Sequence, residues 1–92
     1  MDIKLTSQFK KDIKKLKSSR KGSAVKMILQ NEIIPNLLIR AELASKYKDH
    51  SLIGDWIPAS ECHLFPDTLL IYRIEADSLI LVRLGSHAEL FG

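Results

Sequence analysis

The sequence predicts an α+β fold, in which a small antiparallel sheet carries two N-terminal helices on one of its faces. Two observations predict it. Amphipathic helical patterns occupy residues 8–34, and short apolar runs separated by turn residues occupy residues 56–84. Helices and strands that are segregated along a chain in this way are typical of α+β domains. With 92 residues, 46% of them hydrophobic and 27% charged, we expect one globular domain over residues 1–92.

A short strand and a capped helix are expected first. Asp2–Leu5 alternates polar and apolar residues, which is the pattern of a strand. Thr6 and Ser7 can then cap a helix over residues 8–17, because hydroxyl oxygens accept the free amide hydrogens of a first helical turn. One apolar stripe is formed by Phe9, Ile13 and Leu16. Lysines cover the rest of this helix: Lys10, Lys11, Lys14, Lys15 and Lys17.

A second helix is expected over residues 23–34, after a turn at residues 18–22, so that the two helices form an antiparallel hairpin. Its buried face would consist of Val25, Ile28, Leu29 and Ile33. Pro35 should end this helix, because proline has no amide hydrogen and its ring clashes with the preceding turn. Residues 37–47 are compatible with either a short third helix or a loop over the sheet.

The remaining strands are expected in the second half of the chain. Trp56–Ala59 is predicted to begin a strand that turns near Ser60 into residues 61–65, and residues 68–74 and 79–84 are predicted to form a hairpin. Alternation sorts the side chains of these strands into two faces. One face is apolar, with Cys62, Leu64, Ile80, Val82 and Leu84; the other has Glu61, His63, Phe65, Leu79, Leu81 and Arg83. Helices on the apolar face would leave Glu61, His63 and Arg83 together on the open face.

Positive charge is concentrated near the N-terminus. The net charge is +3, but residues 1–26 contain nine Lys or Arg residues against two Asp or Glu, whereas residues 27–92 contain five against nine. A dense group of lysines on a helix is either a solvated surface or a binding site for a polyanion such as a phosphate backbone. The sequence gives these two interpretations equal weight.

Composition excludes several classes of protein. No apolar run approaches the ~20 residues of a membrane-spanning helix, and charged residues stand where a secretory signal has its apolar core. We therefore expect a cytoplasmic protein with no membrane partner. The single cysteine, Cys62, has no intramolecular partner and is expected to be a small buried hydrophobic residue.

Histidine, aspartate and arginine residues lie near the ends of the predicted strands. His63 precedes the Pro66–Asp67 break, Arg83 lies inside an apolar strand, and His87 follows the end of that strand. Histidine suits both proton transfers of an acid–base reaction, so this set is typical of chemistry on a phosphate. His50, His63 and His87 are separated by 13 and 24 residues with no cysteine nearby, unlike compact zinc motifs, so no metal is expected.

Several of these residues also have a structural interpretation. Asp67 can shape the turn after Pro66, and His63 can bond across to Glu61 or Tyr72. Arg83 can pair with a carboxylate such as Glu61, or it can bind a phosphate through two parallel hydrogen bonds.

Short motifs in the second half of the chain resemble those of a known family. They are K-D-H (48–50), L-I-G-D-W (52–56), E-C-H (61–63), P-D (66–67), L-L-I-Y (69–72), R-L-G-S-H (83–87) and E-L-F (89–91). In this order and spacing they resemble the YafQ branch of the RelE/ParE superfamily, which are toxins of bacterial type II toxin–antitoxin systems. The helical half matches that family only in pattern. The family fold, a small twisted antiparallel sheet with two N-terminal helices on one face, agrees with the fold predicted above.

The resemblance implies a ribosome-dependent endoribonuclease that cuts mRNA in the ribosomal A site, with no metal or other cofactor and with the ribose 2′-OH as nucleophile. The implied partners are a cognate antitoxin protein, mRNA and the ribosome with its rRNA. The matching catalytic positions are His50, His63, Asp67, Arg83 and His87. RNA contacts are expected from Phe91, Lys48, Lys10, Lys11 and Lys14. Phe91 is equally suited to packing in the core and to stacking on a nucleobase.

Within this set, His87 is our first choice for the general acid. His50 and Asp67 compete for the role of general base, and His63 would orient the scissile phosphate. Many relatives have an aromatic residue where this chain has Thr68, so the codon preference of the family is not carried over.

Two other functions stay open at this stage. ParE-type relatives share the fold but poison DNA gyrase without cutting RNA, and an inactive relative would do no more than bind an antitoxin. The acid–base residues favour the endoribonuclease, because a gyrase-binding protein has no need of them.

Overall fold

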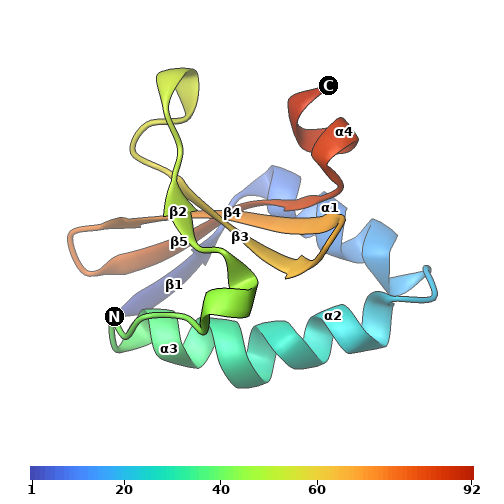
Figure 1. Ribbon diagram of the computed structural model, residues 1–92, viewed down its shortest axis with the longest axis horizontal. Coiled ribbons are helices and arrows are strands. Elements are labelled where there is room, and N and C mark those ends of the chain that lie inside the picture. Colours follow the sequence, from blue (N-terminus) through green and yellow to red (C-terminus); the bar gives the residue numbers. More distant parts are fainter.

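A five-stranded sheet with the order β1-β5-β4-β3-β2 organises the protein, as seen in a computed structural model that describes residues 1–92 (Figure 1). The strands are β1 (Asp2–Leu5), β2 (His50–Ser51), β3 (Ser60–Phe65), β4 (Thr68–Glu75) and β5 (Ser78–Gly85). Strands β2 to β5 pair antiparallel, whereas β1 pairs in parallel with β5. The α+β fold and the β4–β5 hairpin are confirmed, and the parallel pairing of the first strand is an addition to the prediction.

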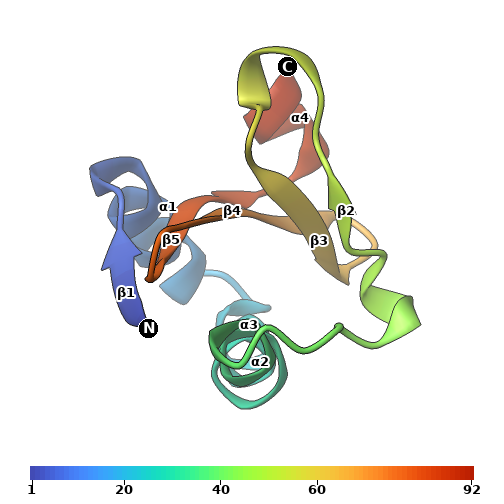
Figure 2. The same cartoon turned by 90° about the vertical axis from the view of Figure 1, so that its left-hand side faces the viewer.

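Helical segments pack beneath this sheet and beside its β5 strand, and the short C-terminal helix lies on its upper side (Figure 2). They are α1 (Ser7–Lys17), α2 (Gly22–Ile28), α3 (Ile34–Leu38) and α4 (His87–Phe91), with single 3₁₀ turns at Ser45–Tyr47 and Gly54–Trp56. From α1 the chain turns back, so that α2 and α3 run in the opposite direction below the sheet (Figure 1). None of these helices has the length and apolar character needed to cross a membrane.

The start of α1 is fixed by Thr6, as the sequence predicts. The Thr6 hydroxyl accepts a hydrogen bond from the amide of Phe9 at 3.0 Å and donates one to the Val82 carbonyl at 2.7 Å. A capping residue that also bonds to a neighbouring strand ties the helix to the sheet at its first turn. Helix α1 therefore runs alongside β5 just beyond the point where β1 ends.

The prediction that Pro35 ends the second helix is wrong. Helix α2 passes through a π-helical turn, Leu29–Ile33, directly into α3. Pro35 lies in the first turn of α3. Amide groups in the first turn of a helix have no hydrogen-bond partner within that helix, so a proline there costs no hydrogen bond. A π-helical turn bonds each amide to the fifth residue back, so it changes the hydrogen-bond register ahead of the proline. The helix then ends at Leu38, and the rest of residues 37–47 is a loop with one 3₁₀ turn.

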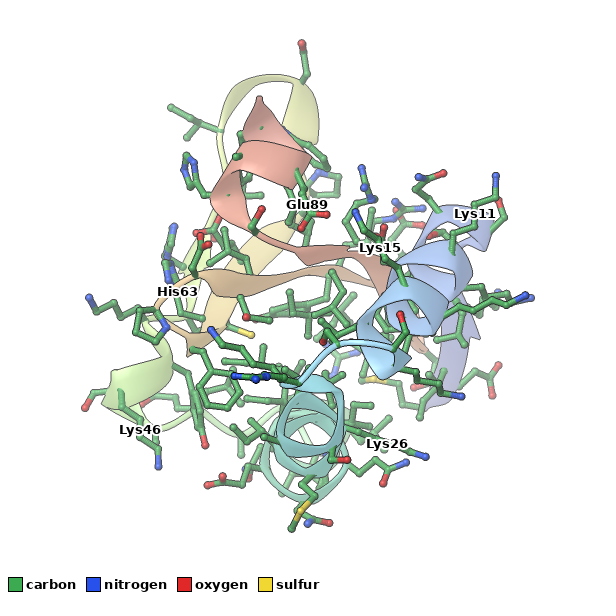
Figure 3. The ribbon with its side chains drawn as sticks, turned by 90° about the vertical axis from the view of Figure 1, so that its right-hand side faces the viewer. Lys11, Lys15, Lys26, Lys46, His63 and Glu89 are labelled. Carbon is green, nitrogen blue, oxygen red and sulfur yellow. The ribbon has the colours of Figure 1, made fainter.

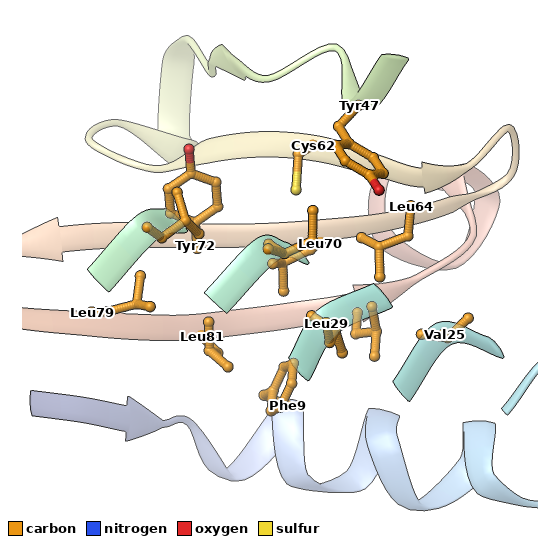
Figure 4. Close-up of a cluster of buried hydrophobic side chains, with 13 residues drawn as sticks. Phe9, Val25, Leu29, Tyr47, Cys62, Leu64, Leu70, Tyr72, Leu79 and Leu81 are labelled. Atoms are coloured by element: carbon orange, nitrogen blue, oxygen red, sulfur yellow. The ribbon is translucent and has the colours of Figure 1, made fainter. Parts of the chain in front are cut away.

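The core lies between the sheet and the helices (Figure 4). Thirteen buried side chains form it: Phe9, Val25, Leu29, Ile33, Leu37, Tyr47, Cys62, Leu64, Leu70, Tyr72, Leu79, Leu81 and Leu84. Cys62 is fully buried and free, as predicted, and burial raises the pKa of its thiol to about 12. Such a thiol stays protonated at neutral pH and is a packing residue.

Irregularities in two strand pairs change the predicted faces. The register between β4 and β5 shifts between Ile71 and Tyr72, which leaves Val82 as an extra residue in β5. Leu79 and Leu81 therefore join Leu84 in the helix-covered core, although strict alternation had placed them with Arg83 on the open face, and Val82 packs on the open face instead. A second shift, between His63 and Phe65, lets Phe65 pack against the same core. Both predicted assignments are wrong because alternation assumes an unbroken ladder.

The segment before β3 also differs from the prediction. Gly54–Trp56 is a 3₁₀ turn, and β3 begins only at Ser60, so Trp56–Ala59 is not a strand. Pro58 gives a physical reason, because a proline has no amide hydrogen for a sheet ladder. The two-residue strand β2, which was not predicted, pairs instead with Ser60 and Glu61 and forms the edge of the sheet.

Candidate active site

Two of the predicted catalytic histidines meet at a buried carboxylate on the β2–β3 edge. His50 lies directly opposite Glu61 in the β2–β3 ladder, and His63 lies two residues further along β3. One oxygen of Glu61, Oε1, is 3.0 Å from Nε2 of His63 and 3.6 Å from Nε2 of His50. The two imidazole centroids are 6.2 Å apart. The structure thus brings His50, Glu61 and His63 into one group, the edge cluster.

The loop before β2 fixes the ring of His50. Nδ1 of His50 lies 2.7 Å from the carbonyl oxygen of Lys48, which has a left-handed backbone with φ of 49°. The neighbouring Asp49 accepts a hydrogen bond from the hydroxyl of Tyr72 on β4. Burial, together with this bond, raises the pKa of Tyr72, so that its hydroxyl remains a donor. Of the two partners considered for His63, Glu61 is the one observed, because Tyr72 bonds to Asp49.

Arg83 lies on the same face of the sheet as the edge cluster but is not part of it. Glu61 is opposite Ile71, and Ile71 is opposite Arg83, so two strand spacings of about 4.8 Å separate the carboxylate from the arginine. The prediction that Glu61, His63 and Arg83 share a face is confirmed. The ion pair considered between Arg83 and Glu61 is not formed.

The carboxylate of Asp12, on α1, holds Arg83 instead. Its Oδ2 and Oδ1 accept hydrogen bonds from Nε of Arg83 at 2.8 Å and from Nη2 at 3.2 Å, and Oδ2 also accepts the amide of Leu84 at 3.0 Å. The bond to Asp12 raises the pKa of Arg83 further above its ordinary value. Sequence reasoning missed Asp12. Its signal was that it is the one acidic residue among residues 6–26, on an otherwise basic helix.

A second group of candidate residues surrounds α4, a helix that was not predicted. Ser86 caps it through a reciprocal pair of bonds with Glu89, an S-x-x-E pattern that the sequence contains. His87 is the first residue of α4, and its side chain is exposed. Oδ1 of Asp67, in the β3–β4 turn, accepts the backbone amide of His87 at 3.4 Å. Asp67 therefore contributes to the position of His87, which agrees with its structural interpretation.

Aromatic packing holds the end of α4. The ring centroid of Phe91 lies 5.0 Å from that of His87 and 5.4 Å from that of Trp56, the latter in an edge-to-face arrangement. Trp56 and Phe91 pack against a small second cluster on the open face of the sheet: Ala59, Leu69, Ile71 and Leu90. Phe91 is half-buried and so combines packing with an accessible ring edge.

A surface ion pair links α4 to α1. Nζ of Lys15 lies 2.6 Å from Oε2 of Glu89. Figure 3 shows these two residues near each other in the upper middle of the view. The bond with Lys15 and the capping bonds from Ser86 lower the pKa of Glu89 to about 2, and the pKa of Lys15 is raised. Lys15 is thus engaged within the protein, whereas Lys10, Lys11, Lys14 and Lys48 are exposed. His63 lies well away from this ion pair in the same view (Figure 3).

The candidate site therefore has three parts on one side of the sheet. They are the edge cluster, the Arg83–Asp12 pair, and the exposed His87 with Asp67 and Phe91 beside it. His63 and Lys48 also line an open groove of about 460 Å³, so the edge cluster is accessible from solvent. No group of three or more His, Cys, Asp or Glu side chains is arranged to hold a metal ion. This arrangement provides proton-transfer groups at two places and a cation on the same face of the sheet.

Solved structures with this fold are bacterial toxins. In the Escherichia coli DinJ–YafQ complex, the similar chain is 36% identical, and the alignment covers 99% of this protein and 98% of that chain with a TM-score of 0.82. A metal-bound toxin from Helicobacter pylori is 41% identical over 99% of both chains, also with a TM-score of 0.82. The fold and its site therefore define a small bacterial toxin.

Sequence comparison gives the particular family. The mRNA interferase toxin YafQ of Escherichia coli K12 is 36% identical over 91 residues, which are 99% of this chain and 96% of that protein. A family model described as the bacterial toxin of type II toxin-antitoxin system, YafQ, matches residues 1–92. The chain belongs to this family, and the resemblance inferred from the sequence motifs is confirmed.

Proposed function

We propose that this protein is an mRNA interferase, a toxin whose single domain, residues 1–92, cleaves mRNA on the ribosome and so inhibits translation in the cytoplasm. Its YafQ relative from Escherichia coli is an mRNA interferase at 36% identity over nearly the whole chain. The structural observation that carries the proposal is the edge cluster, in which two histidines share one buried carboxylate. The Escherichia coli YafQ chain is in complex with DinJ, which supports a cognate antitoxin as the second partner.

His50 is the general base that the geometry supports best. A carbonyl oxygen can only accept a hydrogen bond, so the 2.7 Å contact with Lys48 assigns the proton of neutral His50 to Nδ1. Nε2 then has a free lone pair that can take the proton of a ribose 2′-OH. Asp67, the alternative base, already accepts the amide of His87. We therefore assign the base to His50 and a positioning role to Asp67.

The reaction we propose is an internal phosphoryl transfer. The 2′-oxygen forms a bond to phosphorus as His50 takes its proton, and the bond from phosphorus to the 5′-oxygen breaks as His87 protonates that oxygen. The products are a 2′,3′-cyclic phosphate and a 5′-OH end, and no metal or other cofactor enters the balance. His63 orients the phosphate. Arg83 keeps Nη1 free of Asp12 and stabilises the added negative charge of the transition state.

RNA binding is assigned to the exposed lysines and to Phe91. Lys10, Lys11 and Lys14 on α1, with Lys48 before β2, would contact phosphates of rRNA and mRNA, since such contacts position a protein without reading sequence. The accessible edge of Phe91 would stack on a nucleobase. No observation favours the gyrase-binding alternative, and its relatives have no use for the edge cluster.

The central test compares mRNA bound in programmed ribosomes with the same mRNA free in solution. Cleavage should be much faster on the ribosome, because this small open site cannot by itself align a flexible 2′-OH with the leaving oxygen. The protein is first freed of metal with a chelator, which is then removed, and the free-RNA arm contains EDTA. The metal-bound relative from Helicobacter pylori makes this control necessary. Equal cleavage rates in the two arms would contradict the proposal, as would a requirement for added metal.

A further inference from the structure

Glu61 is the one charged side chain among the buried residues of this protein. It is 5% exposed, and Thr68 is the other buried polar residue. Burying a carboxylate is unfavourable unless its charge is paired. No lysine or arginine lies within ion-pair distance of Glu61, and its partners are His50 and His63. The chain therefore keeps a buried negative charge whose partners are both candidate catalytic residues.

We infer that Glu61 is a positioning residue of this active site, which holds His63 through a hydrogen bond and stabilises the positive charge that His50 gains during the reaction. This inference rests on the function proposed above. It assigns Glu61 a role that goes beyond that of an ordinary strand residue paired with Ile71.

The geometry gives Glu61 a different task toward each histidine. At 3.0 Å, Nε2–H of His63 donates to Oε1 of Glu61, which leaves Nδ1 of His63 free to face the RNA. At 3.6 Å, Nε2 of His50 is too far for a hydrogen bond but close enough for a strong charge interaction. When Nε2 takes the proton of the 2′-OH, the imidazolium of the half-exposed His50 forms beside a carboxylate that is itself buried. A buried carboxylate beside a catalytic imidazole acts in the same way in serine proteases.

The surroundings of Glu61 isolate its effect. Across β3–β4 it faces Ile71, and the neighbouring Leu69 is opposite His63, so the adjacent strand contributes apolar side chains only. The other charged or titratable groups near the cluster are Lys48 and Asp49 in the β2 loop, Glu32 and Lys46 across the groove that His63 lines, and Arg83 two strands away. A stability role is not needed to explain Glu61, because apolar residues of similar size usually replace buried ion pairs without loss.

The test is Glu61→Gln, which keeps the size and an acceptor oxygen but removes the charge. Single-turnover cleavage on ribosomes should fall on the order of 10²-fold, while ribosome affinity stays unchanged. The acidic limb of the pH–rate profile should move to lower pH, because the proton on His50 is no longer stabilised. In NMR spectra of the free protein, the imidazole nitrogen signals of His63 should change, because its hydrogen bond to a carboxylate is replaced by one to an amide. Glu75→Gln, which removes an exposed carboxylate at the far turn, is the matched control.

Glu61→Leu separates the charge from the fold. This variant should melt no lower than the wild type and should lose at least as much activity as Glu61→Gln. Unchanged imidazole signals of His63 and an unchanged pH–rate profile in Glu61→Gln would overturn the inference. If the wild-type protein does not cleave mRNA on ribosomes, the proposed function fails, but the NMR spectra still decide whether Glu61 holds the ring of His63.

Discussion

The two proton-transfer groups of the proposed reaction are held in contrasting ways. His50 lies in a strand ladder beside a buried carboxylate, and its ring is bonded to the Lys48 carbonyl. His87 is exposed on a five-residue helix that follows the last strand. Sheet ladders resist local opening, whereas short terminal helices with few buried side chains are among the least stable parts of a fold. The base is thus preset by the sheet, and the acid lies on an element that can adjust when RNA binds.

The contacts of α4 support this contrast. Leu90 is its one buried residue, and Phe91 is half-buried against Trp56. Two further contacts hold α4. One is the Lys15–Glu89 pair, whose side chains are 76% and 44% exposed, and the other is the long hydrogen bond that the His87 amide donates to Asp67. Exposed ion pairs contribute little and are screened by salt. We therefore expect substitutions around His50 and of His87 itself to lower the cleavage rate strongly. Substitutions in the surface contacts that hold α4 should lower it only slightly.

The largest effect is expected for His87→Gln. An alkoxide is a poor leaving group at neutral pH, so loss of its proton donor should lower the single-turnover rate on the order of 10²–10⁴-fold. Glutamine keeps the size and hydrogen bonding of histidine, and His87 is exposed, so stability and antitoxin binding should be unchanged. The basic limb of the pH–rate profile should disappear, and toxicity in cells should be lost.

A sulfur substitution checks that this loss is due to the missing proton. A substrate with a 5′-phosphorothiolate linkage has a leaving group that departs without protonation. His87→Gln should cut that substrate at close to the wild-type rate. If the variant cuts it no faster than the ordinary substrate, His87 is not the acid, and the contrast between the two sides of the site is wrong.

Arg83→Ala is expected to have the next largest effect, since Arg83 is assigned to the negative charge of the transition state. Donors aimed at developing charge are worth roughly 2.7–4 kcal/mol, so the single-turnover rate should fall about 10²–10³-fold, with a smaller loss of ribosome affinity. The variant also leaves the largely buried Asp12 with only the Leu84 amide, which should lower the free energy of unfolding by about 1–3 kcal/mol.

Asp12→Ala distinguishes the two roles of Arg83. It removes the same ion pair but keeps the guanidinium, so stability should fall while cleavage by the remaining folded protein is largely retained. If Asp12→Ala and Arg83→Ala lose activity equally, Arg83 serves the fold alone. Thermal unfolding and single-turnover kinetics on the two variants give both answers.

The part of the site around His50 and Glu61 was easier to predict from the sequence than the part around His87 and α4. Alternation in β3 placed Glu61 and His63 on one face correctly, because that part of the strand pairs without interruption. It failed at Leu79 and Leu81, because the bulge at Val82 depends on β4 and β5 together and leaves no local signal. Asp12 could not be linked to Arg83 because 71 residues separate them and the contact depends on where α1 lies.

Helix α4 has a local sequence signal, the S-x-x-E capping pattern of Ser86 and Glu89, so its start could be predicted from the sequence.

The smallest effect is expected for Glu89→Gln, which tests the ties of α4 directly. Glutamine can replace glutamate in the capping bonds, so the variant loses only the charge that pairs with Lys15. The pKa of Glu89 is lowered to about 2 in the folded protein. Its stabilisation is therefore present above the ordinary glutamate range near pH 4.5 and lost as the pH falls toward 2. Because the side chain is 44% exposed, the contribution should be no more than about 1 kcal/mol.

Melting temperatures of the wild type and Glu89→Gln, measured from pH 7 to pH 2, give the measurement. The difference should be a few degrees at neutral pH, shrink in high salt, and vanish at the acidic end. Cleavage on ribosomes should change little, since the His87 side chain is intact and α4 is free to adjust around the RNA. A difference in melting temperature that persists at pH 2 would mean that Glu89 acts through packing. If Glu89→Gln loses as much activity as His87→Gln, α4 must be held as strictly as β2, and the acid is preset in the same way as the base.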